Sequence, residues 1–287
     1  GVYAILKVEV NNSASESNLN ISGGDLVCEI NGDIGGQLAI NYKIELPETD
    51  EERENIGSLI KGLVVDVLGY NDYMIEQSEY VLPSEIEKDP GETYWDVISE
   101  LVKLYYTYEA FFDADGQFIF QKKSTNYYDP VIWDSREENA VINIDRVLDY
   151  ANIRNKFVVD GKLDDDNTQY TYTLEVKDSD YPNNPFTIEK LGDTRVMYEE
   201  KNKYTTNDQC KEYAEYLMVN HTNCADQATI SCVPLYFLEV NDMIYLYDEK
   251  TKTDGKYAID NIDCDLGHEG IMSITAHRVY GVNGGEI

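Results

Sequence analysis

The sequence predicts an α+β protein that is mostly β, with a small helix-and-hairpin module followed by a β-barrel-like domain. Two observations carry this prediction. Residues 93–105 repeat apolar side chains at helical spacing, and the chain then alternates with a period of two over 108–122. Beyond residue 131, short alternating segments recur at intervals typical of barrels and sandwiches. We expect three parts, at residues 1–46, 47–130 and 131–287.

Residues 1–46 are expected to form β-strands. Residues 2–10 alternate well enough for a strand, whereas the polar stretch 11–20 indicates a loop. The segments 25–30 and 37–46 are strand-like, and the glycine-rich stretch 31–36 between them suits a hairpin turn. Because a strand pattern is present from the first residues, we expect the chain to be a fragment of a longer protein.

The module at 47–130 begins with an acidic linker at 47–54 and a helical pattern at 56–68 that ends at Gly69. Thr93 and Asp96 have the spacing of a capping box at the start of the second helix. A strand, a tight turn at Asp113-Ala114-Asp115-Gly116 and a second strand follow. The remaining segments are expected to be a short strand or helical turn at 73–81 and a loop at 83–91.

The third part is expected to be built from short strands around one helix. Residues 205–220 form this helix, capped by Thr205 or Thr206, with one apolar face made by Cys210, Tyr213, Ala214, Leu217 and Met218. Strand patterns occur at 140–144, 155–159, 170–176, 228–233, 243–248, 256–262 and 272–280. An acidic turn is expected at 161–167.

Composition narrows the class of function. The chain has 287 residues, 42% of them hydrophobic, which excludes global disorder. Its net charge of −32, from 55 acidic and 23 basic residues, repels nucleic acid and anionic membranes. The acidic surface is either an ordinary solvated one or one past which DNA can move without sticking. The 24 tyrosines suit half-buried strand faces and interfaces.

Five cysteines, an odd number without a C-x-x-C pair, indicate free thiols in an intracellular setting. No run of 18 apolar residues and no signal peptide is present in the sequence, so no membrane association is expected.

Several side-chain groups resemble sites, and each has a simpler interpretation. Asp113 and Asp115 match only the start of a calcium loop, so a hairpin turn is favoured. Asp164-Asp165-Asp166, near Asp160 and Asn167, and the similar group of Asp178, Asp180 and Asn183 are either cation sites or, preferably, exposed acidic turns.

Zinc-type ligands occur at His221, Cys224, Cys232 and Cys264, with a spacing that fits no standard zinc knuckle. The turn at 31–36 lacks the residues of a phosphate loop. No motif pairs a cysteine with His221, His268 or His277 for nucleophilic catalysis. We therefore predict no catalytic, cofactor-binding or metal-binding residue, no cofactor and no enzymatic activity.

The order of these parts resembles the tail hub, or baseplate hub, proteins of tailed phages and prophages of Gram-positive bacteria. The resemblance covers about residues 85–281 and leaves open whether the tail is contractile or flexible. The matching segments are 91–98, 112–118, 152–161, 184–192, 204–210, 233–234 with 238–244, 256–262 and 271–278. Because the family has a further N-terminal β-domain, the resemblance implies that residues 1–46 are the end of a truncated N-terminal β-domain.

This resemblance implies a structural virion protein at the tip of the tail tube. It implies a homotrimeric ring through which DNA passes, made in the host cytoplasm and found in the virion tail. Expected partners are distal tail, tape-measure or tail-fibre proteins, without stable nucleic-acid binding. The hairpin at 108–122 is expected at the subunit seam and Trp95 in a core. The alternatives are a cell-wall or carbohydrate-binding β-module, which would use Trp95 or Trp133 as a sugar platform, and, less favoured, a peptidoglycan hydrolase.

Overall fold

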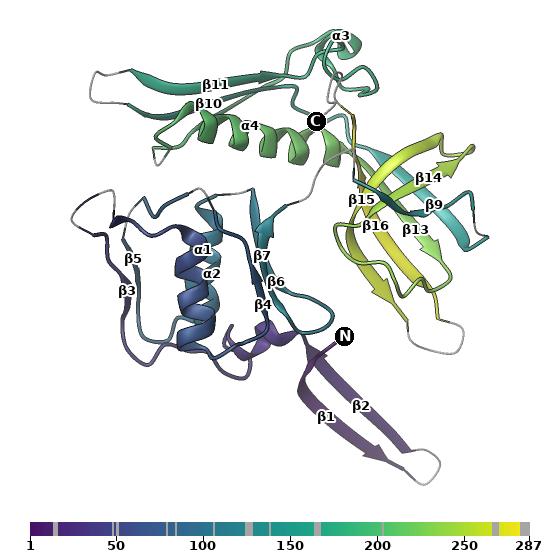
Figure 1. Ribbon diagram of the computed structural model, residues 1–287. Helices are drawn as coiled ribbons and strands as arrows, with labels where there is room; N and C mark the ends of the chain where they lie inside the picture. Colours follow the sequence, from purple (N-terminus) through teal and green to yellow (C-terminus); the bar gives the residue numbers. More distant parts are fainter. Residues whose placement is uncertain are drawn as a thin grey trace. The chain divides into compact units, whose positions relative to one another are not determined.

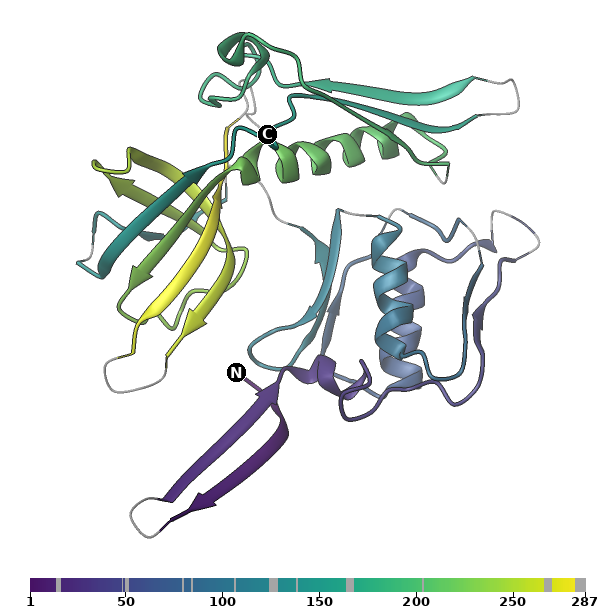
Figure 2. The ribbon, with the colours of Figure 1, turned by 180° about the vertical axis from the view of Figure 1, so that it is seen from behind.

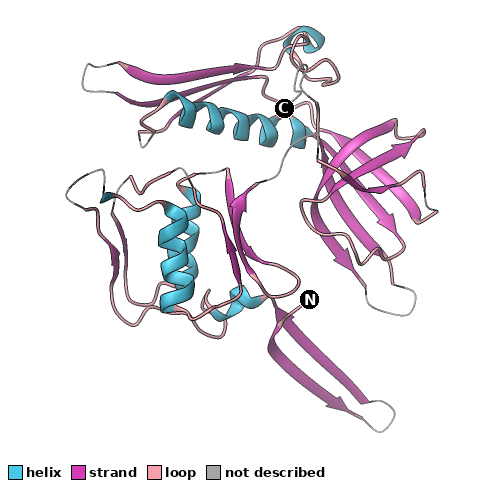
Figure 3. Cartoon of the chain, viewed as in Figure 1, coloured by secondary structure: helices cyan, strands magenta, loops and turns pink. Residues whose placement is uncertain are grey.

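The chain folds into two compact units, which are described separately (Figure 1). Unit 1 is Gly1–Lys123 and unit 2 is Ser124–Ile287. The computed structural model describes residues 1–13, 17–47, 49, 52–78, 80–83, 85–105, 107–123, 129–137, 139–163, 168–202, 204–265 and 270–281. Strands outnumber helices in the described residues (Figure 3), in agreement with the predicted mostly-β class.

Unit 1 begins with a two-stranded antiparallel hairpin, β1 (Ala4–Asn12) and β2 (Ser17–Gly24). A 3₁₀ helix, η1 (Leu26–Glu29), follows it. Both views show this hairpin extending away from the rest of unit 1 (Figures 1 and 2). The hairpin corrects the prediction of a loop at 11–20.

A helical layer in unit 1 lies between two small sheets (Figure 1). One sheet pairs β3 (Tyr42–Ile44) with β5 (Ile86–Lys88), and the other has the order β4-β7-β6. The strands of the second sheet are β4 (Tyr73–Ile75), β6 (Tyr108–Phe112) and β7 (Phe118–Lys122). Strand β5 replaces the loop predicted at 83–91.

The two helices of unit 1 begin and end where the sequence places them. Helix α1 (Ile56–Lys61) continues as a π-helical turn, η3 (Gly62–Val67), and the chain leaves it at Gly69 with φ +80°. Helix α2 (Tyr94–Lys103) starts with the predicted capping box. The Thr93 hydroxyl accepts from the Asp96 amide at 3.1 Å, and the Asp96 carboxylate accepts from the Thr93 amide at 2.8 Å.

The core of unit 1 is formed by the inward faces of these helices together with the β6–β7 hairpin. Val97, Ile98 and Leu101 of α2 are fully buried, as is Phe118 of β7. The structure corrects the strand predicted at 25–30, because Asp25 begins a short helix there. Its carboxylate accepts from the Val27 amide at 3.1 Å and caps η1 instead.

Unit 2 contains a curled six-stranded sheet that forms a half-barrel with the order β8-β14-β15-β16-β13-β9. Its apolar core is lined by Trp133, Ile230, Tyr257 and Ile274, among others. The strands are β8 (Val131–Asp134), β9 (Val141–Leu148), β13 (Asp226–Cys232), β14 (Met243–Asp248), β15 (Thr253–Cys264) and β16 (Met272–Arg278).

A second sheet in unit 2 has the order β11-β10-β12 and packs against the long helix α4 (Asn207–His221). Its strands are β10 (Lys156–Leu163), β11 (Gln169–Glu175) and β12 (Val196–Glu200), with β12 parallel to β10. The Thr206 hydroxyl caps α4 by accepting from the Gln209 amide at 3.2 Å. The sequence analysis missed β12 and the one-turn helix α3 (Ile188–Leu191).

Candidate functional site

The turn at Asp113 is built as a hairpin turn. The Asp113 carboxylate accepts from the backbone amides of Asp115 at 3.0 Å and Gln117 at 2.8 Å. Gly116 adopts φ +84°, a conformation that favours glycine. The carboxylate is therefore engaged within its own turn, as the sequence interpretation favoured.

The glycine-rich stretch 31–36 closes over the start of α2 and does not connect two strands. The Tyr94 amide donates to the Gly36 carbonyl at 3.0 Å, and the Trp95 amide donates to the Ile30 carbonyl at 3.0 Å. Together with the capping bond at Asp96, these bonds occupy the first-turn amides that a bound phosphate would need.

In the acidic turn after β11, the carboxylate of Asp178 is bound by a hydroxyl and a lysine of the same segment. Asp178 accepts from the Thr187 hydroxyl at 2.6 Å and pairs with Lys190 at 3.2 Å, and these bonds lower the pKa of Asp178, the Thr187 bond most. Asp160 accepts from the Tyr198 hydroxyl at 2.9 Å. The predicted turn Asp164–Asp166, with Asn167, lies outside the described residues.

The zinc-type ligands are not gathered into a site. The described residues hold no group of three or more His, Cys, Asp or Glu side chains placed to bind a metal ion. Cys232 lies in the half-barrel core, where burial, with a smaller contribution from Cys264, raises its pKa to about 11. All five cysteines are free thiols in the structure.

One histidine has the partner that a catalytic dyad needs, but a reactive thiol does not accompany it. His277 Nδ1 lies 2.7 Å from Asp260 Oδ1 on neighbouring strands. Burial, aided by the charge of Asp260, raises the pKa of Cys224 to about 12, so this thiol stays protonated at neutral pH. His268 lies outside the described residues.

Neither tryptophan forms an open sugar platform in its unit. Trp133 is buried in the half-barrel core at 4% exposure. Trp95 is half-buried and packs against the core of unit 1, so it is less enclosed than the sequence analysis expected.

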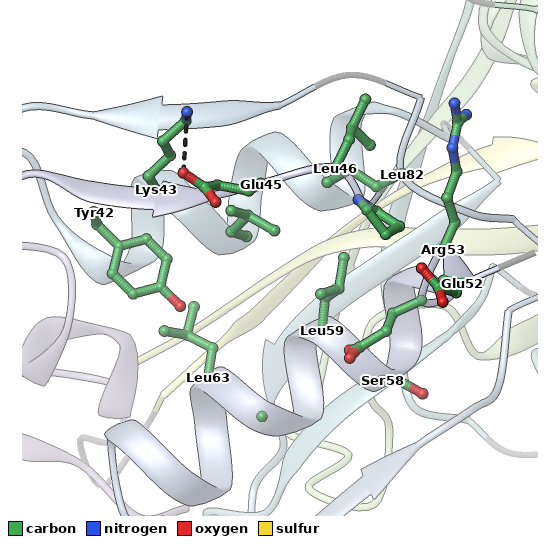
Figure 4. A pocket seen from close by; sticks show the side chains of 14 residues that line it. Tyr42, Lys43, Glu45, Leu46, Glu52, Arg53, Ser58, Leu59, Leu63 and Leu82 are labelled. Carbon is green, nitrogen blue, oxygen red and sulfur yellow. Dashed lines mark ion pairs between the residues drawn. The ribbon is translucent and has the colours of Figure 1, made fainter. Parts of the chain in front are cut away.

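A pocket in unit 1 has a volume of about 520 Å³ and lies between β3, its following segment and α1 (Figure 4). Leucine side chains from several segments, among them Leu46, Leu59 and Leu63, line it. Its charged Lys43 is already paired with Glu45 at 3.3 Å and Glu85 at 3.1 Å. The lining also includes Glu52, Arg53 and Glu54, so the pocket combines leucine side chains with a comparable share of charged groups.

The β1–β2 hairpin is the most unusual surface of unit 1, because one of its faces is apolar and uncovered. Val8 lies opposite Ile21 and Val10 opposite Leu19. Cross-strand partners point to the same face, so these four side chains form one patch. Their exposed fractions are 53%, 58%, 73% and 61%, respectively.

The other face of the hairpin is polar. It carries an ion pair between Lys7 and Glu9 and the cross-strand pair Asn11 and Asn18. A two-stranded ribbon with one bare apolar face is at best marginally stable alone, so this face suits packing against another surface. We call Val8, Val10, Leu19 and Ile21 the hairpin patch.

The β6–β7 hairpin does not have this character. Phe112, Phe118, Ile119 and Phe120 are buried in the core of unit 1, with exposures of 6%, 0%, 4% and 1%. These side chains cannot also form a seam between subunits. The structure therefore corrects the assignment of the seam to residues 108–122.

A buried charge network in unit 2 was missed by sequence reasoning. Asp226 is fully buried and accepts from Arg146 Nε at 2.8 Å, Arg146 Nη2 at 2.7 Å and the Tyr280 hydroxyl at 2.6 Å. Burial, followed by the Asp226 charge, raises the pKa of Tyr280 far above its ordinary value. The three residues are far apart in the sequence, and no local spacing signals their contact.

Within the described ranges, no helix has the length and apolar character that crossing a membrane requires.

Three solved structures share the fold over 96% of this chain. They are the prophage MuSo2 43 kDa tail protein from Shewanella oneidensis, a tail protein from Neisseria meningitidis MC58 and the prophage tail protein gp18 from Listeria monocytogenes EGD-e. Sequence identities are 13%, 12% and 14%, and TM-scores are 0.63, 0.65 and 0.55. The match covers 78%, 79% and 76% of those chains.

The three sources do not single out a Gram-positive origin. A search of curated proteins finds no match to this chain. The family described as "Domain of unknown function (DUF5048)" matches residues 183–282. What the comparisons show is a fold that this chain shares with three tail proteins, two of them from prophages.

Proposed function

We propose that this chain is a structural protein of a phage or prophage tail. The observation that carries the proposal is the fold shared with three tail proteins over 96% of the chain. Two observations on the candidate sites support a structural rather than a catalytic role. The carboxylates of Asp113 and Asp178 are engaged by backbone amides, a hydroxyl and a lysine, and the buried thiols Cys224 and Cys232 have raised pKa values.

The proposal places the protein in the hub at the tip of the tail tube, as a homotrimeric ring through which DNA passes. The net charge of −32 supports this placement, since an acidic wall does not retain DNA. Ring partners would be copies of this chain, with distal tail, tape-measure or tail-fibre proteins above and below.

In this proposal the hairpin patch forms part of the contact between copies. Strongly acidic copies repel one another, so their contacts are best made where little net charge lies. The described hairpin strands carry one lysine and one glutamate, which are paired with each other. The patch therefore combines bare apolar area with local neutrality, and it replaces residues 108–122 as the proposed seam.

Sedimentation of the full-length protein at micromolar concentration tests the assembly. We expect a trimer for the parent and a monomer for the double variant Val10→Asp/Leu19→Asp. The matched control is Asn11→Asp/Asn18→Asp, which adds the same charge to the polar face of the same hairpin and should remain trimeric. A monomeric parent would refute the ring, and a trimeric patch variant would refute the seam alone.

A mobility-shift assay with duplex DNA tests the acidic wall. We expect no retained duplex at low salt, where electrostatic binding is strongest. A complex that dissolves as salt is raised would contradict a hub that lets DNA pass.

A further inference from the structure

The three-stranded sheet of unit 2 ends in β11, whose outer edge has no neighbouring strand among the described residues. The Thr171 amide points outward and donates to Asn207 Oδ1 at 3.0 Å. Alternation along the strand gives Thr173 and Glu175 the same outward direction. The partner strand agrees with this direction. Lys156 lies opposite Glu175, and its backbone amide donates to the Arg195 carbonyl on the far side of β10 and not to β11.

The edge therefore offers outward backbone groups at Thr173 and Glu175, beyond the point that Asn207 covers. Neither of these two backbone amides donates a hydrogen bond to another described residue. Free edge groups of this kind are templates for an added strand.

A groove of about 490 Å³ runs along this edge. One wall is Tyr172–Glu175 of β11, and the rest of the lining is Lys177, Asp180 and Tyr181 of the following segment and Glu215 of α4. A peptide pairing with β11 would place a side chain in the groove, because both walls lie beside the same edge.

The charges in the groove select the kind of side chain. Glu175 is neutralised by Lys156 and Lys177, which lie 2.7 and 2.5 Å away. The charge of Asp180 also acts on Lys177, and within the described part of the chain no close ion pair joins Asp180 or Glu215 to a lysine or arginine. Both carboxylates act on Tyr181, whose pKa is raised to about 12 by burial first and then by Glu215 and Asp180. The groove lining thus combines an aromatic ring with three carboxylates and one lysine, an excess of negative charge.

We propose that β11 accepts an extended segment of another protein as an added strand, and that the groove holds a lysine or arginine side chain of that segment. Backbone pairing at Thr173 and Glu175 supplies the register. The basic side chain lies against the Tyr181 ring and between the carboxylates of Asp180 and Glu215. A second copy of this acidic chain is a poorer occupant than a basic partner, by charge alone. The inference concerns unit 2 and does not depend on the ring.

Fluorescence anisotropy with the full chain tests both parts of the site. The probe is a labelled eight-residue peptide of alternating threonine and lysine, measured at 150 mM salt, a concentration chosen to screen long-range attraction. We expect saturable binding at micromolar concentrations. A twin with glutamate in place of lysine should not bind, and a twin with N-methylated backbone amides should bind at least about tenfold more weakly, because it has lost the strand hydrogen bonds.

Two variants of the protein complete the test. Glu215→Gln, on an exposed position of α4, should weaken binding by about tenfold, the loss of a charge-assisted contact. Glu200→Gln, an equal charge change on β12 of the same sheet, should leave binding unchanged. Both should keep the parent's circular dichroism spectrum.

Four outcomes would overturn the proposal. The first three are equal binding of the N-methylated twin, equal weakening by Glu200→Gln, and full competition by free glucosamine, which would make the groove a site for amino sugars. Absence of saturable binding up to millimolar peptide would overturn it as well.

Discussion

The two hairpins of unit 1 resemble each other locally and differ in what covers them. In β6–β7, the apolar side chains Phe118 and Phe120 are 0% and 1% exposed, because the hairpin packs beneath the helical layer. In β1–β2, Val10 and Leu19 are 73% and 61% exposed. Period-two alternation predicts a strand with one apolar face. It does not tell whether that face finds its cover in the same chain, in another chain or in a missing segment.

The largest expected effect comes from the covered hairpin. Phe118→Ala should lower the free energy of unfolding of unit 1 by about 3–5 kcal/mol, since it empties a fully enclosed aromatic site. Urea denaturation of the full chain, followed by circular dichroism, measures it. A loss below about 1 kcal/mol would mean that this hairpin is not part of the core.

Trp95 sharpens the comparison, because it lies at the rim of the same core. Trp95→Ala should cost about 1–3 kcal/mol, less than Phe118→Ala, since the indole is only half-buried. The same denaturation series gives the answer. A cost equal to that of Phe118→Ala would show that the ring is fully enclosed in solution.

The capping box of α2 makes the stability of unit 1 depend on pH. Hydrogen bonds from the Thr93 hydroxyl and amide lower the pKa of Asp96 below its ordinary 3.8. A carboxylate with a depressed folded-state pKa stabilises the fold above its unfolded pKa, and this stability is lost as pH falls through the folded value.

Asp96→Asn should therefore cost about 0.5–2 kcal/mol at pH 7 and less at pH 2. Urea midpoints of parent and variant between these pH values test the sign. Asp115→Asn, in the exposed turn of β6–β7, is the control and should show a smaller dependence. A cost that grows on acidification would contradict the box.

The smallest effect on stability is expected from the uncovered hairpin. Val10→Ser/Leu19→Ser should change the unfolding free energy of the monomeric chain by no more than about 0.5 kcal/mol, because neither side chain is buried there. Thermal denaturation of dilute protein measures it. A loss of several kcal/mol would show that the patch is covered within the chain, and would remove it as a contact surface.

Local signals in the sequence predicted much of the fold. The spacing of Thr93 and Asp96 located the start of α2, Thr206 capped α4 and the strand at 243–248 was predicted at its observed bounds. Each depends on neighbours within four residues or on strict alternation. These are the interactions that a single sequence displays directly.

Other features depended on contacts between distant residues. In β2, serine and asparagine residues surround Leu19 and Ile21, so the segment has the composition of a loop. Its strand character depends on pairing with Val8 and Val10 of β1. The seam was misplaced for the same reason, because aromatic content does not reveal which layer covers it. The Asp226 network joins strands β9 and β13 to the segment after β16, and the groove at β11 needs Glu215 from another element.

The topology of the half-barrel has a consequence for the order of synthesis. Strand β8 pairs with β14 across roughly 110 residues of sequence, and β9 pairs with β13 across roughly 85. Such non-local pairings form slowly and only after the later strands have left the ribosome. Unit 1 depends on no strand beyond β7, so it is able to fold first. The bare hairpin is then present on a nascent chain whose second half is still incomplete, and neighbouring chains on one polysome can meet there before either is finished.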